Sequence, residues 1–209
     1  MYDMKSPSPA RGYRMAARAE AAARTARGIL AAAAELWRER PIDEITLEAI
    51  AERAGVAART VIRRFGSRAG VIAACIEADA AGIVSERGQA AAGDVEGALA
   101  VLLAHYERDG DAVLRTLALE EKVPEARAIA QAGRAGHRAW CARVFAPYLP
   151  PSDDDARELR LDAFVAATDL YAWKLLRRDL GRSADETGRV MRALVDGLVS
   201  LSRPPTRGA

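Results

Sequence analysis

The sequence predicts an all-α protein, because its composition, its apolar periodicity and its turn signals all favour helices. Apolar residues make up 50% of the 209 residues, but aromatic residues make up only 5%. Ala, Leu, Arg and Glu, which favour helices, dominate the chain. Apolar residues recur at helical spacing, whereas no β-hairpin signal and no internal repeat is found. A chain of this length can bury a sizeable core in one or two domains.

Cysteine usage and charge distribution bear on the compartment and the partner. Cys75 and Cys141 form no CxxC pair and no disulfide framework, which favours a reducing cytoplasm. Neither a signal peptide nor an apolar stretch of about 18 residues is found, so we expect a cytoplasmic protein with no membrane span. Residues 1–72 carry 13 Lys and Arg against 8 Asp and Glu, although the net charge of the chain is only +2. A basic N-terminal third favours a polyanionic partner.

The first forty residues predict an arm followed by a helix. Residues 1–20 contain Pro, Ser and several Arg without clear periodicity, which is typical of a flexible basic arm. Apolar residues at helical spacing then predict a helix over residues 21–40, which Pro41 ends.

Two short helices around a tight glycine turn form the most informative stretch. One helix is expected over residues 47–54, with Thr46 as its N-cap and Gly55 in a left-handed turn after it. The next is expected over residues 58–65 and ends before Gly66. This order, packed on a longer first helix, is the pattern of a helix-turn-helix, whose second short helix enters the major groove of DNA.

The second short helix concentrates positive charge. Arg59 and Arg63 are four residues apart and therefore share a helix face, which carries no carboxylate. Arginine can bond guanine O6 and N7 together, so both are candidates for base contacts. Arg64 and Arg68 follow, where phosphates would lie. The alternative is a solvated charged face. The glycine turn and the uneven charge of the chain favour DNA binding.

Beyond residue 67 the sequence predicts more helices. Ser67 can cap a connecting helix, and a later helix begins with the capping-box pair Ser183 and Glu186. The other helices are expected over residues 95–108, 111–119, 125–145 and 154–180. The resulting division is an arm over residues 1–20, a helix-turn-helix domain over 21–67, a connecting helix over 68–88 and a helical C-terminal domain over 89–209.

Residues from about 24 to 79 resemble the N-terminal domain of TetR-type transcriptional regulators. The matching residues are Ile29 to Trp37, Ile45-Thr46-Leu47, Ile50-Ala51, Ala54-Gly55-Val56, Thr60-Val61 and Phe65 to Arg68. The resemblance implies a regulator that is not an enzyme and needs no cofactor, most often a repressor. In such proteins the C-terminal helices bind a small-molecule effector and form a homodimer, which would read a palindromic double-stranded DNA operator.

Several positions depart from the family pattern. Ala57 stands where a capping Ser is common, and Ile62 stands where a Tyr often touches a phosphate. Arg59, Arg64 and Arg68 replace a small residue, a His and a Lys. The operator therefore cannot be inferred from relatives. The residues expected to contact DNA are Thr46, Ala57, Ala58, Arg59, Thr60, Arg63, Arg64 and Arg68. Arg11 and Arg14 in the arm could also reach a neighbouring minor groove.

The C-terminal helices supply candidates for an effector pocket and a dimer interface. The pocket candidates are Leu103, Tyr106, Leu117, Trp140, Phe164 and Tyr171, although large apolar residues are more often core. The helix expected over residues 154–180 is apolar almost all round, and with the helix after it could form half of a four-helix bundle between two subunits. The interface candidates are Leu161, Phe164, Leu175, Val190, Leu194 and Leu198. The alternative is that both helices are core helices of a monomer.

Motifs for other chemistry are absent. His137 and Cys141 are four residues apart, but two ligands do not make a metal site, so no metal is expected. The sequence has no GxSxG, HExxH, P-loop or GxGxxG motif. The first hypothesis is therefore a ligand-responsive homodimeric repressor. The others are an activator or ligand-independent regulator on the same fold, and an all-α scaffold or enzyme with an incidental basic patch.

Overall fold

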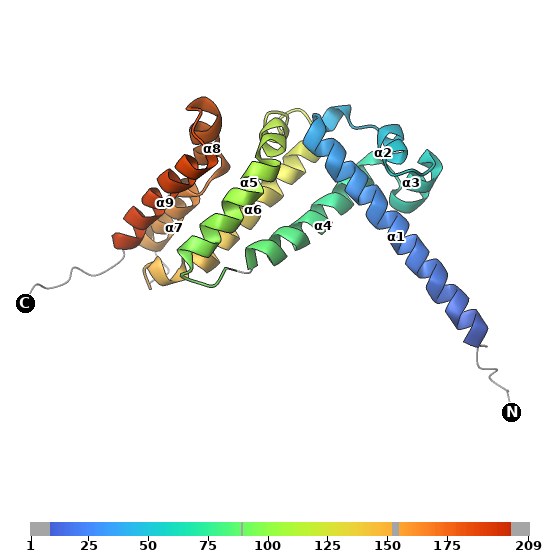
Figure 1. Cartoon of the computed structure of the whole chain (residues 1–209), viewed down its shortest axis with the longest axis horizontal. Coiled ribbons are helices and arrows are strands. Elements are labelled where there is room, and N and C mark those ends of the chain that lie inside the picture. Colours follow the sequence, from blue (N-terminus) through green and yellow to red (C-terminus); the bar gives the residue numbers. More distant parts are fainter. Residues whose placement is uncertain (1–8, 89, 152–154, 202–209) are drawn as a thin grey trace, which may run out of the picture. The chain divides into compact units, whose positions relative to one another are not determined.

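The computed structural model describes residues 9–88, 90–151 and 155–201, whose regular structure is entirely helical (Figure 1). This confirms the all-α prediction. The chain forms two compact units, Met1–Cys75 and Ile76–Ala209, so the division lies within the helix that was expected to connect the two domains. In the described ranges, no helix combines the length and the apolar composition needed to cross a membrane.

Helix α1 (Pro9–Glu39) begins much earlier than predicted. The sequence predicted an arm up to residue 20, whereas residues 9–20 are the first turns of this helix. The physical reason is intrinsic propensity: Ala, Arg, Met and Glu dominate this segment and favour a helix without a core to pack on, and proline is well tolerated in a first turn. The side chains of Arg11 and Arg14, and residues 1–8, lie outside the described part.

The N-terminal unit packs α1 against a group of short elements. These are η1 (Ile42–Glu44), α2 (Leu47–Arg53), α3 (Ala58–Phe65) and the first turns of α4 (Arg68–Gly88). The largest fully buried side chains of this core are Ile29, Leu36, Ile50, Val61 and Val71. Each of these helices thus buries one apolar stripe and leaves its other faces to solvent.

The C-terminal unit is a bundle around a core rich in aromatic residues. Its elements are α5 (Val95–Leu117), α6 (Pro124–Val144), η2 (Ala146–Tyr148), α7 (Asp155–Ala167), α8 (Leu170–Lys174), η3 (Leu175–Asp179) and α9 (Ala184–Ser200). Phe145 and Phe164 stack at the centre with ring centroids 4.3 Å apart. The rings of Trp140 and Trp173 are buried in the same core.

Helix α5 is continuous where two helices were predicted. The sequence predicted separate helices over residues 95–108 and 111–119, but one helix runs through Gly110 to Leu117. A Cβ atom at Gly110 would lie 2.7 Å from two atoms of the Trp173 ring. The glycine is therefore required by the close approach of the indole, and its cost in helix propensity is offset by that packing.

The helix predicted over residues 154–180 is interrupted at Thr168 and Asp169. The Thr168 hydroxyl is buried and donates to the Phe164 carbonyl at 2.7 Å, and the Asp169 carboxylate accepts the Tyr171 amide at 2.8 Å. Short polar side chains that bond nearby backbone compete with the helical ladder and start a new helix instead. A π-helical turn, η3, follows α8 and ends at Asp179, and Gly181, two residues further on, has a φ of 64°.

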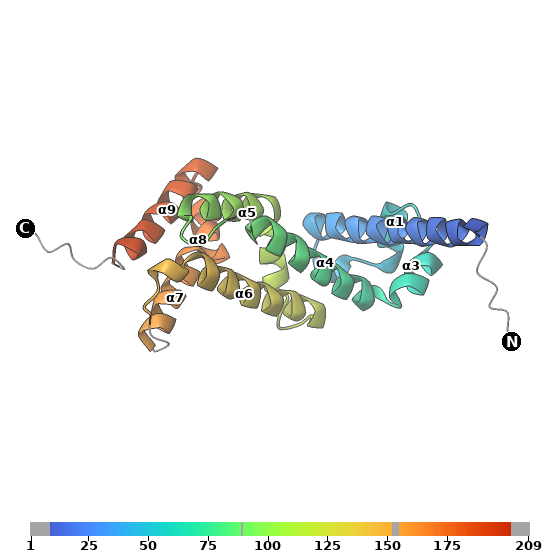
Figure 2. The same cartoon turned by 90° about the horizontal axis from the view of Figure 1, so that it is seen from below.

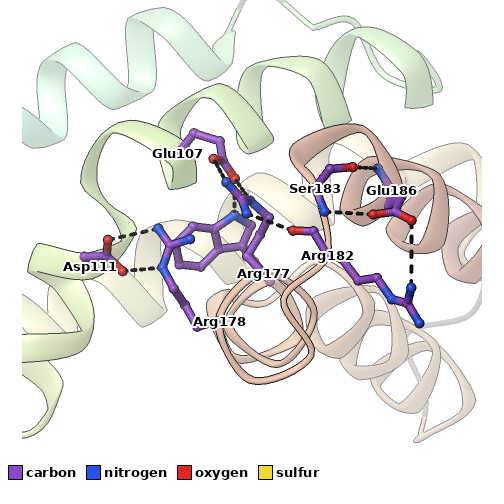
Figure 3. Close-up of polar contacts among 8 residues, drawn as sticks. Glu107, Asp111, Arg177, Arg178, Arg182, Ser183 and Glu186 are labelled. Carbon is purple, nitrogen blue, oxygen red and sulfur yellow. Dashed lines mark hydrogen bonds and ion pairs between the residues drawn. The ribbon is translucent and has the colours of Figure 1, made fainter.

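Two arginine forks hold η3 against α5 (Figure 3). Arg177 donates to both carboxylate oxygens of Glu107 at 2.8 Å, and Arg178 donates to those of Asp111 at 2.8 and 2.9 Å. These bonds lower the pKa of the Glu107 and Asp111 carboxyls. The guanidinium of Arg178 also lies 4.6 Å from the centre of the Trp173 ring. The two arginine forks therefore hold η3, which directly follows the helix of Trp173, against α5.

The predicted capping box at the start of α9 is confirmed. The Ser183 hydroxyl accepts the Glu186 amide at 3.2 Å, and the Glu186 carboxylate accepts the Ser183 amide at 2.9 Å (Figure 3). Because each side chain satisfies a backbone donor that the helix leaves unpaired, the pair fixes where α9 begins.

Candidate nucleic-acid interface

The turn between α2 and α3 has the local geometry that the sequence predicted. Thr46 caps α2 by accepting the Ala49 amide at 3.1 Å. Gly55 adopts a φ of 65°, and the Val56 amide returns to the Ala51 carbonyl at 2.9 Å. A glycine in this left-handed position closes one helix and turns the chain at once into the next. The two short helices and their turn lie beside α1 in the same unit (Figures 1 and 2).

Helix α3 has one buried face and one basic face. Val61 is fully buried and Phe65 is half-buried, which fixes the helix on the core of the unit. Arg59 and Arg63 are exposed on another face, and neither has a carboxylate partner among the described residues. Thr60 is half-buried between these faces. Two unpaired guanidiniums on one exposed helix face can donate to base edges or phosphates.

A bidentate ion pair braces the helix-turn-helix against α1. Arg53, the last residue of α2, donates to both carboxylate oxygens of Glu39 at 2.8 and 2.7 Å. The same guanidinium donates to Glu35 at 3.3 Å. Because the guanidinium donates to it, the pKa of the Glu39 carboxyl is lowered. This brace links the end of α2 to α1, and the sequence had not indicated it.

The remaining candidates on the two short helices lie at their N-terminal ends. The Thr46 side chain is exposed, so its hydroxyl can cap α2 and still face a ligand. Ala57 is exposed at the N-cap of α3 and makes no capping bond, because its methyl side chain has no hydrogen-bond acceptor. Ala58, the first residue of α3, is half-buried. The N-terminus of α3 therefore has no side-chain cap, and uncapped amides at a helix N-terminus can bind phosphate.

Arg64 and Arg68 have intramolecular partners that the sequence did not predict. The Arg64 guanidinium donates to the Ala22 carbonyl of α1. Arg68 is half-buried, and it donates to the carbonyls of Ile45 and Ile42 at 2.7 and 2.6 Å. These bonds tie α3 to α1 and α4 to η1. The structure thus gives both side chains a role in holding the unit together, in addition to the phosphate contacts expected for them.

Replacing Arg68 with alanine is expected to destabilise the N-terminal unit by about 1–3 kcal/mol, because two carbonyls lose charged donors. Arg63→Ala is the matched control, since Arg63 is exposed, and should change stability by less than about 0.5 kcal/mol. Chemical unfolding followed by circular dichroism measures both. Equal stability of Arg68→Ala and the parent would show that the two hydrogen bonds do not hold the unit together.

Two glycines follow α3, and the sequence indicated only the first of them, as the end of the helix. Gly66 ends the helix with a φ of 77°. A Cβ atom at Gly70 would overlap the carbonyl oxygen of Phe65, so the first turn of α4 lies directly against the end of α3. A glycine in the first turn of a predicted helix, which is otherwise unfavourable there, was the available signal.

Ile62, at the centre of α3, is 48% exposed and places an apolar surface beside the arginines.

The residues expected to line an effector pocket do not share one environment. Tyr106, Trp140 and Phe164 are buried in the core of the C-terminal unit, whereas Leu103 and Leu117 are half-buried at its edge. Tyr171 is 57% exposed and does not belong to the core.

A buried polar group lies within this aromatic core. His137 Nε2 is 3.1 Å from the Thr168 hydroxyl and 3.7 Å from the Cys141 sulfur. Among the described residues no three His, Cys, Asp or Glu side chains cluster as metal ligands do.

The expected interface residues divide into a buried and an exposed set. Leu161 and Phe164 are buried within the unit itself, so their assignment to a subunit interface is wrong. The reason is that α7 uses this stripe to pack on α6 and α9. Leu175, Val190 and Leu194 are 51%, 40% and 49% exposed. Leu198 is half-buried, and its carbonyl accepts a hydrogen bond from Arg160 of α7 at 3.0 Å.

Comparison with known proteins agrees with this geometry. An N-terminal unit with a capped helix, a glycine turn and a basic second helix defines a helix-turn-helix DNA-binding protein. Residues 29–75 match the family model for bacterial regulatory proteins of the tetR family. The match covers the helix-turn-helix unit, so this part of the chain is similar to the DNA-binding domain of tetR-family regulators. A comparison with curated protein sequences found no match.

Two solved structures share the fold at low sequence identity. One is a protein from Pseudomonas aeruginosa PAO1 described as a transcriptional regulator, with a TM-score of 0.62 and 14% identity, which covers 84% of this chain and 90% of that one. The other is described as a TetR-family regulator from Mesorhizobium loti MAFF303099, with a TM-score of 0.60 and 17% identity, covering 86% of this chain and 97% of that one. At these identities the likeness extends to the fold alone.

Proposed function

We propose that the protein is a homodimeric repressor that binds a palindromic operator through α3 and leaves it when a small molecule binds in the C-terminal unit. The observation that carries the proposal is the basic face of α3. Arg59 and Arg63 are exposed and have no carboxylate partner in the described part of the chain. Their helix is fixed by buried Val61, by the brace of Arg53 and by Gly55. An arginine guanidinium can bond guanine O6 and N7 together.

Dimerisation is supported by an apolar face on α9. Val190 and Leu194 are exposed one turn apart, and Leu201 lies in line with them two turns further along and is 70% exposed. On α7, which packs against α9, Leu159 is 69% exposed. Large apolar side chains gathered on one face are a sign of a protein interface. A two-fold dimer would present two recognition helices to sites about 34–36 Å apart, one turn of DNA.

Leu194→Glu is expected to convert the dimer to a monomer, because a carboxylate would be buried without a partner at the two-fold interface. Sedimentation velocity should show a fall in mass by half, and affinity for the operator should drop at least tenfold. Ala132→Glu, at an exposed position of α6, is the matched control and should remain dimeric. A dimeric Leu194→Glu protein would place the interface elsewhere.

Effector binding is supported by the composition of the C-terminal core. His137 and Thr168 lie among the rings of Trp140 and Phe164. The hydroxyl of Thr187 on α9 is fully buried and has no hydrogen-bond partner among the described residues. Buried polar groups among aromatic rings are suited to a largely apolar ligand with one or two hydrogen-bonding groups. Such a ligand acts by binding the non-operator conformation more tightly.

The test of the function begins with selection of duplexes from a random-sequence library by the purified chain. A repressor predicts enrichment of a palindrome, and higher expression of a reporter carrying that palindrome when the gene is deleted. Lower expression on deletion would indicate an activator instead. Enrichment of no sequence would overturn the proposed function. The cytoplasmic location expected from the sequence belongs to the same proposal.

A further inference from the structure

Helix α1 extends far beyond the region shared with the family. The matched region begins at residue 29, and α1 begins twenty residues earlier, at Pro9. At 1.5 Å per residue this extension is about 30 Å long. Between residues 9 and 28 the sequence has five arginines and one acidic residue, Glu20. The extension is therefore a strongly basic helix joined without a break to the DNA-binding unit.

The arginines of the extension are placed on a particular face. Ile29 and Leu36 are buried on the stripe of α1 that faces the core. Continued toward the N-terminus by the helical repeat, this stripe passes through half-buried Thr25 and Ala22 and then reaches Arg18. In the sequence, positions 11 and 14 fall in the same helical register and are also arginine, and their side chains lie outside the described residues. The face that packs on the domain thus becomes a basic face where the domain ends.

This basic stripe begins beside the recognition helix. The Arg64 guanidinium, near the end of α3, donates to the Ala22 carbonyl, and both helices belong to one compact unit. Arg18 follows one turn further along, where α1 continues past α3 (Figures 1 and 2). Arg18 is exposed and has no carboxylate partner among the described residues, unlike Arg24, which pairs with Glu20 at 2.9 Å.

We propose that this basic stripe of the α1 extension, with Arg18 nearest to α3, binds the phosphates that flank the operator. The inference rests on the proposed function, because it takes α3 to lie in the major groove. That groove is about 12 Å wide, whereas the helix continues for about 20 Å beyond Ala22. The extension is thus long enough to reach phosphates at the edge of the groove. Such contacts add affinity without reading sequence.

The composition of the extension favours DNA over a lipid surface. Its two large exposed apolar side chains, Tyr13 and Met15, are 79% and 66% exposed. They are two residues apart, so they project about 200° from each other around the helix. A helix that lies on a membrane needs a continuous apolar face, which these positions do not provide. A basic stripe without an apolar face is suited to a polyanion in water.

The experiment compares Arg18→Gln with Arg27→Gln in the full chain. Both side chains are exposed and neither has a carboxylate partner among the described residues, but Arg27 lies on the opposite face of the same helix. Glutamine keeps the helix propensity of both positions. The probes are two duplexes carrying the palindrome that the parent chain selects, one trimmed to its ends and one with about ten more base pairs on each side. Fluorescence anisotropy over a salt series gives the dissociation constants.

On the longer duplex Arg18→Gln should bind about fivefold more weakly at 0.15 M salt, and the slope of log K against log salt should fall by about 0.9 for each phosphate that the variant no longer neutralises. Arg27→Gln should bind like the parent, and on the trimmed duplex all three proteins should bind alike. Parent-like binding of Arg18→Gln to the longer duplex, or an equal weakening in both variants, would overturn the proposal. If the parent selects no palindrome, the proposed function fails and this proposal fails with it.

Discussion

Trp173→Ala is expected to lower the free energy of unfolding of the C-terminal unit by about 3–5 kcal/mol. The indole is fully buried, and its Nε1 donates to Glu107 at 2.8 Å. One edge of the ring lies over Gly110, and the guanidinium of Arg178 lies over its face at 4.6 Å. Removing the ring would leave a cavity where α5 and α8 meet, and the tightly packed side chains around it could fill that space only if the backbone moved.

Gly110→Ala tests whether the Trp173 ring packs directly on Gly110. In the parent it should be destabilising by about 1–3 kcal/mol, because the new methyl group would overlap the indole. In the Trp173→Ala background the methyl group has room, so the same change should cost much less. Urea unfolding followed by circular dichroism gives all four free energies. Additive effects of the two substitutions would contradict the packing of the ring on Gly110.

The helix-turn-helix could be predicted almost to the residue because its boundaries are set by local chemistry. The Thr46 hydroxyl caps α2, Gly55 supplies the positive φ after it, and Gly66 does the same after α3. Each of these signals acts within four residues of the atom that it bonds. The start of α1 was missed because the expected signal was apolar periodicity, whereas residues 9–20 are helical by propensity alone.

The C-terminal unit was harder to predict because its breaks depend on tertiary contacts. Gly110 continues a helix because Trp173 lies against it, and the Thr168 hydroxyl at the end of α7 lies 3.1 Å from His137 Nε2 of α6. Phe164 and Leu194 illustrate the same limit for the interface. Both are large apolar residues at helical spacing, yet one is fully buried and the other is 49% exposed. Periodicity identifies an apolar face without saying which chain covers it.

The four arginines of the predicted site show what sequence could not distinguish. Arg59, Arg63, Arg64 and Arg68 are alike in charge and spacing, but Arg68 bonds two carbonyls of its own unit and Arg64 bonds one. The carbonyls belong to α1, to η1 and to the residue after η1, more than twenty residues away in sequence. Only the tertiary packing shows that Arg59 and Arg63 are not used within the unit and remain available to bind a ligand.

Arg59→Ala and Arg63→Ala are each expected to weaken binding to the selected operator by about 1–3 kcal/mol, or roughly 5- to 150-fold. A bidentate contact to guanine discriminates between bases, so each variant should also lose its preference at one base pair of each half-site. Neither change should alter unfolding, because both side chains are exposed and have no intramolecular ion pair among the described residues. Fluorescence anisotropy against the operator and its single-base variants measures this.

Arg64→Ala is the matched control for Arg59 and Arg63, the two arginines expected to contact base edges. Its guanidinium is engaged with the Ala22 carbonyl, so its removal should affect all duplexes alike and should leave the base preferences unchanged. Loss of preference at a base pair in Arg64→Ala, with none in Arg59→Ala or Arg63→Ala, would mean that α3 enters the groove by its C-terminal end. Recognition would then depend on the side chains nearest to α1, and the face that carries Arg59 and Arg63 would contact only phosphates.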